Sequence, residues 1–124
     1  MEEIHTDDAP AAIGPYSQGI IDGDRIFVSG QGPIDPETGD IVGEDIKEET
    51  EQTLDNIETV LEAAGASMDD IIKATVFVND MDNYEEINEV YAEYMSEPYP
   101  ARSAVEVSDL PVPIGVEIEV IARA

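Results

Sequence analysis

The chain has 124 residues, of which 42% are hydrophobic, 30 are Asp or Glu and only five are Lys or Arg, so its formal net charge at pH 7 is −25. This length predicts a single domain over residues 1–124, able to bury roughly two thirds of its unfolded surface. The lack of cysteine excludes disulfides, thiolate metal sites and cysteine nucleophiles, and the negative charge argues against a nucleic-acid-binding module, which depends on clustered Lys and Arg.

The first predicted elements are two strands over residues 16–21 and 25–30. The turn Asp22-Gly23-Asp24 lies between them, and because Asp and Gly tolerate positive φ it is typical of a β-hairpin. A turn-rich stretch follows over residues 32–40, with room for a short strand near Ile41.

A helix is predicted next, because apolar residues and threonines recur at helical spacing from Ile46 to Ala64. Asp45 and Glu48 form a capping-box pattern at its start. Gly65 follows its last turn and ends it as a C′ residue.

Residues 71–78 form the next predicted strand, rich in β-branched and aromatic residues. A second helix follows, with Asp82 or Asn83 as its cap and Pro98 and Pro100 beyond its end. Its apolar stripe consists of Tyr84, Ile87, Tyr91, Tyr94 and Met95.

Two last strands are predicted over residues 101–107 and 116–122, separated by a proline-bearing loop. The order β-β-(β)-α-β-α-β-β predicts an α+β fold with two helices on one face of a mixed sheet. Several strands carry apolar residues on both sides and no third helix is available, so we expect self-association to cover the second face.

Arg102 is the most informative single residue, because a chain with few cations places it in an apolar strand. Its planar guanidinium fits a carboxylate, either a substrate's or that of one of the 30 acids. If the last two strands pair antiparallel with Arg102 opposite Ile121, then Arg102 and Glu119 are diagonal neighbours at roughly 7 to 8 Å. An acid and a cation so placed could hold a small carboxylate-bearing substrate, or Glu119 could simply neutralise Arg102.

Other site types find less support. His5 is the only histidine, which disfavours a Ser/His/Asp triad or a multi-histidine metal site. Two acidic groups could bind a hard cation weakly, but neither has the spacing of a calcium loop, and we predict no specific metal site. The groups are Asp80, Asp82 and Glu85, and Asp35, Glu37 and Asp40.

The acidic coat resembles that of proteins from extreme halophiles, where molar salt reduces the screening length to about 3 Å. We expect the acids to gather on outward helix faces, such as Glu48, Glu51, Asp55, Glu58 and Glu62. The start Met-Glu-Glu-Ile has no basic or apolar leader, and no stretch approaches 18 apolar residues, so a cytoplasmic protein without a membrane segment is expected.

Six segments occur in the order and spacing of one family: GPYSQG (14–19), FVSGQ (27–31), LDNI (54–57), TVFV (75–78), YPARSAVEV (99–107) and VEIE (116–119). The chain resembles the RidA family, the reactive-intermediate deaminases, from about residue 10 to 122. The resemblance implies a chorismate-mutase-like fold, a homotrimer with active sites between subunits, and no cofactor.

The implied reaction is the hydrolysis of 2-imino acids and their enamine tautomers to 2-oxo acids and ammonia. Arg102 would bind the substrate carboxylate, and Glu119 would activate the attacking water. The resemblance also implies that Tyr16, Ser29, Gly30, Asn88 and Ala104 contact the substrate. Taken alone, Tyr16, Ser29 and Asn88 would be an ordinary strand aromatic, a turn cap and a solvated helix residue.

The sequence departs from the family at Ala104, where many members have cysteine. Water activated by a carboxylate needs no thiol, so deamination remains the prediction, while any thiol-dependent activity is excluded. Two alternatives stay open: a non-catalytic trimer that binds small metabolites, and an endoribonuclease or translation inhibitor, which the charge of −25 makes less favourable.

Overall fold

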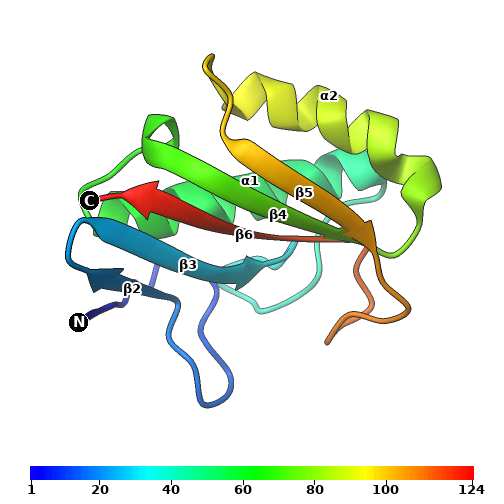
Figure 1. The fold of residues 1–124 in the computed structure, drawn as a ribbon. Helices are drawn as coiled ribbons and strands as arrows, with labels where there is room; N and C mark the ends of the chain where they lie inside the picture. The colour runs from blue at the N-terminus through cyan, green and yellow to red at the C-terminus, as the bar shows by residue number, and fades with distance from the viewer.

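One mixed six-stranded sheet, with two helices packed on one of its faces, forms the framework of the computed structural model, which describes all residues 1–124 (Figure 1). The strands lie side by side in the order β1-β2-β3-β6-β4-β5. Their bounds are β1 Glu2–Ile4, β2 Gly19–Asp22, β3 Arg25–Gln31, β4 Ile71–Val78, β5 Ala101–Glu106 and β6 Val116–Arg123; the helices are α1 Ile46–Ala63 and α2 Tyr84–Tyr94, with short 3-10 turns at Met68–Asp70 and Met81–Asn83. The predicted α+β architecture is confirmed.

The N-terminal hairpin forms as predicted. β2 and β3 pair antiparallel, and Gly23 in the turn has φ +62°, which favours glycine. β2 begins at Gly19 rather than at Tyr16, and before it the buried Gln18 side-chain amide holds the N-terminal segment, accepting from the Thr6 N–H at 2.8 Å and donating to the Pro10 carbonyl at 2.9 Å. β1 was not predicted, because three residues are too few to show an alternating pattern.

α1 has the predicted ends. The Asp45 carboxylate accepts a hydrogen bond from the Glu48 N–H at 2.9 Å, and Gly65 takes φ +81° just beyond the C-terminus. In a capping box the Glu48 side chain would accept from the N–H of the N-cap residue Asp45. It accepts instead from the N–H of the preceding residue, Glu44. The buried face of α1 packs on the sheet through residues with no exposed surface: Leu54, Ile57, Val60 and Leu61.

The connection of the last two strands differs from the prediction. β5 pairs with β4 alone, in parallel, while β6 inserts between β3 and β4 and is antiparallel to both. The helix α2 returns the chain to the outer edge of β4, and the loop after β5 then crosses to the other side of β4 (Figure 1). The predicted antiparallel pair of residues 101–107 with 116–122 is therefore wrong.

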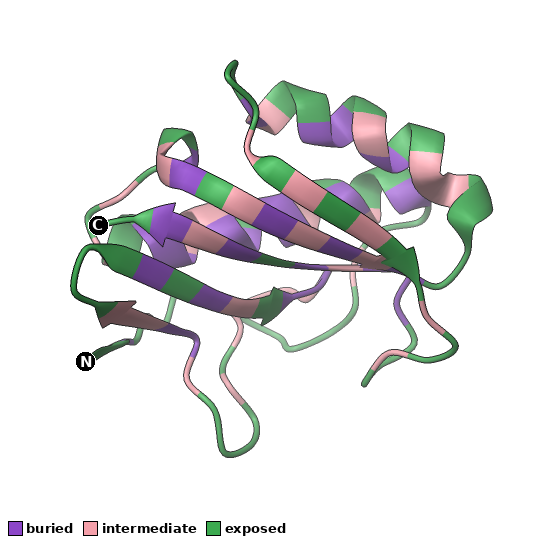
Figure 2. Ribbon diagram, in the orientation of Figure 1, coloured by how far each residue is buried: buried purple, intermediate pink, exposed green.

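The face of the sheet opposite the helices is uncovered in the single chain, and we call it the open face. Along β3, β4 and β6, exposed or half-buried positions alternate with buried ones, whereas the edge strand β5 has no fully buried residue (Figure 2). Phe27 and Val105 on this face leave 44% and 41% of their surface exposed, and Phe77 and Ile121 are half-buried there. This apolar surface is therefore in contact with solvent in the single chain.

The outward face of α1 carries the predicted row of acids. Glu48, Glu51, Asp55 and Glu62 are exposed, whereas Glu58 is half-buried. Burial, with the charges of Glu62 and Asp55, raises the pKa of Glu58. No helix combines the length and the apolar character needed to cross a membrane.

Candidate functional site

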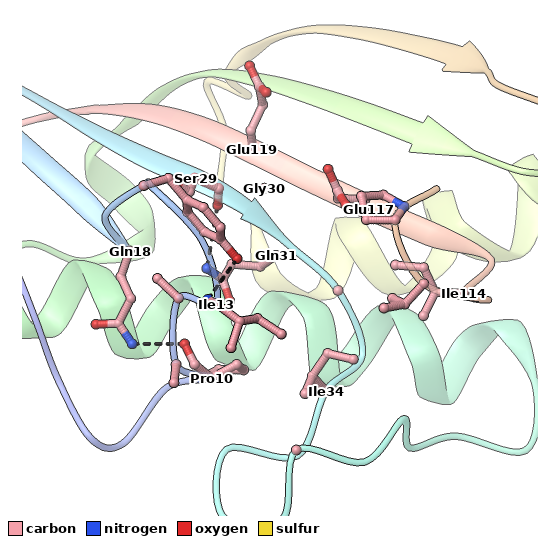
Figure 3. Close-up of a pocket in the computed structure, with 17 residues that line it drawn as sticks. Pro10, Ile13, Gln18, Ser29, Gly30, Gln31, Ile34, Ile114, Glu117 and Glu119 are labelled. Atoms are coloured by element: carbon pink, nitrogen blue, oxygen red, sulfur yellow. Dashed lines mark hydrogen bonds between the residues drawn. The ribbon is translucent and has the colours of Figure 1, made fainter. Parts of the chain in front are cut away.

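A cleft of about 690 Å³ opens beside β3 and β6 (Figure 3). Its walls come from the N-terminal segment 10–18, from β3 and the loop after it, from the loop before β6 and from β6 itself. Four of the residues predicted for the site line it: Tyr16, Ser29, Gly30 and Glu119.

A β-bulge brings three of these four residues together. Val28 pairs with Val120 and Gln31 pairs with Ile118, so Ser29 and Gly30 on β3 both lie opposite Glu119 on β6. Bulges of this kind redirect side chains and are common beside active sites. The Ser29 hydroxyl donates to the Ser17 carbonyl at 2.6 Å, which ties the bulge to the segment that carries Tyr16.

Tyr16 closes the cleft on the N-terminal side. It is 52% exposed, and its hydroxyl accepts a hydrogen bond from the Ile13 N–H at 3.4 Å. An aromatic ring held at the rim in this way offers both an apolar surface and a hydroxyl to a small ligand.

Glu117 is a cleft residue that the sequence analysis did not single out. It is two residues from Glu119, so both carboxyls project from the same face of β6 (Figure 3). Glu117 is half-buried against Gly30, and Glu119 is exposed. Burial, and secondarily the charge of Glu119, raises the pKa of Glu117.

Arg102 belongs to a second cluster, on the helix side of the sheet. Its Nη2 donates to the Tyr84 hydroxyl at 2.8 Å, and its guanidinium carbon lies 4.7 Å from the ring centre of Tyr91 and 5.5 Å from that of Tyr84. These contacts orient the guanidinium by cation–π attraction and one neutral hydrogen bond. Burial raises the pKa of the Tyr91 hydroxyl, and the positive charge of Arg102 partly opposes this.

Arg102 has no carboxylate partner, although the chain contains 30 acids. The other two arginines are paired, Arg25 with Asp24 at 3.1 Å and Arg123 with Asp70 at 3.3 Å. A half-buried guanidinium without a counter-charge is suited to an anionic ligand.

Asn88 and Ala104 lie with Arg102 in this second cluster. Tyr84, Asn88 and Tyr91 follow at spacings of four and three, which places them on one stripe of α2, and Ala104 shares the face of Arg102 on β5. Asn88 Oδ1 and Tyr91 Oη are buried without a hydrogen-bond partner. These two unsatisfied atoms could accept or donate hydrogen bonds to a ligand at Arg102.

The predicted proximity of Arg102 and Glu119 within one chain is wrong. Arg102 and Val120 both pair with Ala74, so Arg102 shares its face with Val120, and the neighbouring Glu119 points to the opposite face. β4 also lies between the two strands. The candidate residues therefore form two half-sites: the cleft half-site, with Tyr16, Ser29, Gly30, Glu117 and Glu119, and the arginine half-site, with Tyr84, Asn88, Tyr91, Arg102 and Ala104.

The acidic groups considered as weak cation sites serve local structure instead. Asp80 accepts a hydrogen bond from the Asp82 N–H at 2.9 Å, and Asp35 accepts from the Glu37 and Thr38 N–H groups at 2.8 and 3.1 Å. No three His, Asp or Glu side chains in the chain are grouped so that they could hold a metal ion.

Comparisons with known proteins cover nearly the whole chain. Residues 6–124 match the family model described as Endoribonuclease L-PSP. A RutC family protein of Pyrococcus horikoshii is 56% identical over 98% of this chain and 96% of its own, and the 2-iminobutanoate/2-iminopropanoate deaminase of Escherichia coli K12 is 45% identical over 96% of this chain and 94% of its own.

Solved structures agree with this result. RidA from the Antarctic bacterium Psychrobacter sp. superposes with a TM-score of 0.96 at 44% identity and covers all of both chains. Escherichia coli TdcF with bound serine gives a TM-score of 0.94 at 42% identity, covering 100% of this chain and 99% of its own.

Proposed function

The chain belongs to the RidA family, and from this premise we propose that it is a 2-iminobutanoate/2-iminopropanoate-type deaminase. The reaction converts a 2-imino acid and water into a 2-oxo acid and ammonia. Relatives named for this activity support the proposal, but the observation that carries it is the unpaired, half-buried Arg102.

Arg102 is proposed to bind the carboxylate of the substrate. Tyr84 occupies only one of its five N–H donors, so the guanidinium keeps a pair of N–H groups for two parallel hydrogen bonds to a carboxylate. Asn88 and Tyr91 supply unsatisfied polar atoms beside it, and the small side chain of Ala104 leaves room on the same face. The arginine half-site thus selects a small anionic substrate.

Glu119 is proposed to activate the attacking water. Its carboxylate is exposed in the cleft and lies opposite the Ser29–Gly30 bulge. Ser29, Gly30 and Tyr16 would orient the substrate there. This chemistry uses only carboxylate, hydroxyl and backbone groups, so we propose no cofactor.

A complete site requires two copies of the chain, because the two half-sites face opposite sides of one sheet. We propose a homotrimer in which the arginine half-site of one subunit meets the cleft half-site of the next around the ring. The apolar side chains of the open face, Phe27, Phe77, Val105 and Ile121, support burial of this face between subunits.

The direct test is ammonia release from 2-iminopropanoate or 2-iminobutanoate generated in situ, measured at molar salt. We expect release well above the spontaneous rate, with the matching 2-oxo acid as the second product. Substrate-analogue binding without turnover would instead favour a metabolite-binding trimer, and the solved structure of TdcF with bound serine shows that a relative of this chain can hold a small amino acid. RNA cleavage is disfavoured, because a chain of charge −25 repels phosphates.

Assembly should depend on salt. Three chains of −25 each carry −75 together, and lowering the salt from about 1 M to about 0.01 M extends the screening length from about 3 to about 30 Å. We expect the trimer to weaken and the deaminase rate to fall in parallel over this range. Light scattering measures the trimer and ammonia release measures the deaminase rate across one potassium chloride series. A fully active trimer in millimolar salt would refute the halophilic interpretation and leave the proposed deaminase function standing.

A further inference from the structure

We propose that Tyr84 is a further substrate-binding residue, whose hydroxyl donates a hydrogen bond to the same carboxylate that Arg102 binds. The inference rests on the proposed deaminase function and names the residue that completes its carboxylate subsite. Arg102 supplies two N–H donors, and Tyr84 supplies a third donor.

The Tyr84 hydroxyl has a proton to donate. A phenol carries one O–H donor and lone pairs that accept. The Tyr84 oxygen accepts from Arg102 Nη2 at 2.8 Å, and no hydrogen-bond acceptor of the chain receives its proton. The side chain is the first residue of α2 and is half-buried, so its hydroxyl remains accessible to a ligand at Arg102. The proton is therefore available to an acceptor that the single chain does not supply.

The contact with Arg102 makes an anion the favoured acceptor. An oxygen that accepts from a cation becomes a stronger donor, because hydrogen bonds in a chain polarise one another. A carboxylate only accepts hydrogen bonds and has about four lone-pair sites, enough for two guanidinium N–H groups and one phenol proton. A cationic or donor-rich ligand would instead meet donors from both Arg102 and Tyr84.

Two tyrosine rings hold the guanidinium beside this hydroxyl. Its central carbon lies 4.7 Å from the ring centre of Tyr91 and 5.5 Å from that of Tyr84. Tyr91 is buried, so its ring is fixed by the packing of α2 on the sheet. Unlike an ion pair, these contacts leave the positive charge of Arg102 uncompensated. The three donors are therefore held in place before the substrate binds, which reduces the entropy lost on binding.

Two acids on the elements that form this half-site are engaged elsewhere. Glu106 shares the face of Arg102 on β5, and it accepts a hydrogen bond from the Met81 N–H at 2.7 Å. Glu89 on α2 is paired with Lys47 of α1 at 2.6 Å. The donors of the half-site therefore remain open to a carboxylate that comes from outside the chain.

The test compares Tyr84→Phe with wild type and with Tyr94→Phe. Phenylalanine keeps the ring beside Arg102 and removes only the hydroxyl. The control removes another hydroxyl of α2, which donates to Asp55 of α1 at 2.7 Å. A bond to the carboxylate is present in the bound substrate and in the transition state alike. In Tyr84→Phe we therefore expect KM to rise about 10- to 100-fold, the range for one hydrogen bond to a charged group, with kcat within about threefold of wild type. Tyr94→Phe should match wild type.

Calorimetric binding of the product 2-oxobutanoate measures the same contact without turnover, and its Kd should rise by the same factor in Tyr84→Phe. To separate contact with the carboxylate from orientation of the guanidinium, Tyr84→Phe is repeated in Arg102→Lys chains, which have no guanidinium to orient. We expect the Kd to rise again by about tenfold or more in that background. An unchanged Kd there would show that the hydroxyl acts only through the guanidinium, and it would overturn the proposed contact.

The remaining outcomes distinguish this proposal from the proposed function. An active Tyr84→Phe with wild-type KM and wild-type binding of 2-oxobutanoate overturns the role of Tyr84 and leaves the deaminase function standing. Binding of 2-oxobutanoate that depends on Tyr84, in a wild type that releases no ammonia, contradicts the deaminase function and supports the role of Tyr84. A wild type that neither binds 2-oxobutanoate nor releases ammonia contradicts both.

Discussion

Replacement of Arg102 by alanine is expected to abolish deamination while the fold and the trimer persist. The side chain is half-buried and its direct contacts are with Tyr84 and Tyr91, so its removal breaks no ion pair and leaves the sheet pairing of β5 intact. Two charge-assisted hydrogen bonds to a substrate carboxylate are worth about 3 to 6 kcal/mol together, so kcat/KM should fall by a factor between about 150 and about 25,000.

The matched control is Arg25→Ala, which removes an arginine paired with an exposed acid at the hairpin turn. Arg102→Lys adds a second comparison, because lysine keeps the charge but loses the planar fork and its stacking on tyrosine, and should recover only part of the activity. Near-normal kinetics of Arg102→Ala, with correct trimer mass, would eliminate the proposed carboxylate-binding role.

Replacement of Glu119 by glutamine should have the second largest effect. The amide preserves the volume and polarity of an exposed side chain, so the stability of the protein should change little, but it cannot accept the proton of the attacking water. We expect kcat to fall by about 100-fold or more, with KM nearly unchanged because substrate binding depends on Arg102. Steady-state ammonia release gives both constants.

Glu106→Gln provides a control on a strand. Glu106 is an exposed carboxylate of β5 that accepts a hydrogen bond from the Met81 N–H and does not line the cleft that holds Glu119. Full turnover by Glu119→Gln would show that another group activates the water, and Glu117 would then be the first residue to examine.

The local structure could be predicted where a few residues determine it. Asp22-Gly23-Asp24 requires a turn, Asp45 and Gly65 mark the two ends of a helix, and the apolar run of residues 71–78 forms the strand over those residues. The pairing of the last strands could not be obtained in this way. The loop of residues 107–115 is long enough either for a hairpin or for a crossing past β4, and only packing of the whole sheet selects the crossing.

For the candidate site, too, the sequence predicts which neighbouring residues share a face of a strand but not how distant strands are placed. Strand alternation places Arg102 and Ala104 on one face of β5, and Glu117 and Glu119 on one face of β6, but it does not say that the two pairs face opposite sides of the sheet. Tyr84 and Tyr91 were assigned to an apolar stripe, since a hydrogen bond and ring stacking to an arginine 11 or more residues away leave no local pattern.

The central claim is that a working site takes its arginine from one chain and its carboxylates from another. Its most direct test is to combine inactive Arg102→Ala and Glu119→Gln chains by co-expression with different tags, isolate mixed trimers and measure ammonia release. In every isolated mixed trimer, whichever chain is present twice, one site in three has both an intact Arg102 and an intact Glu119, so about a third of wild-type activity should return. Mixed trimers of verified composition that remain as inactive as either parent would contradict the shared site.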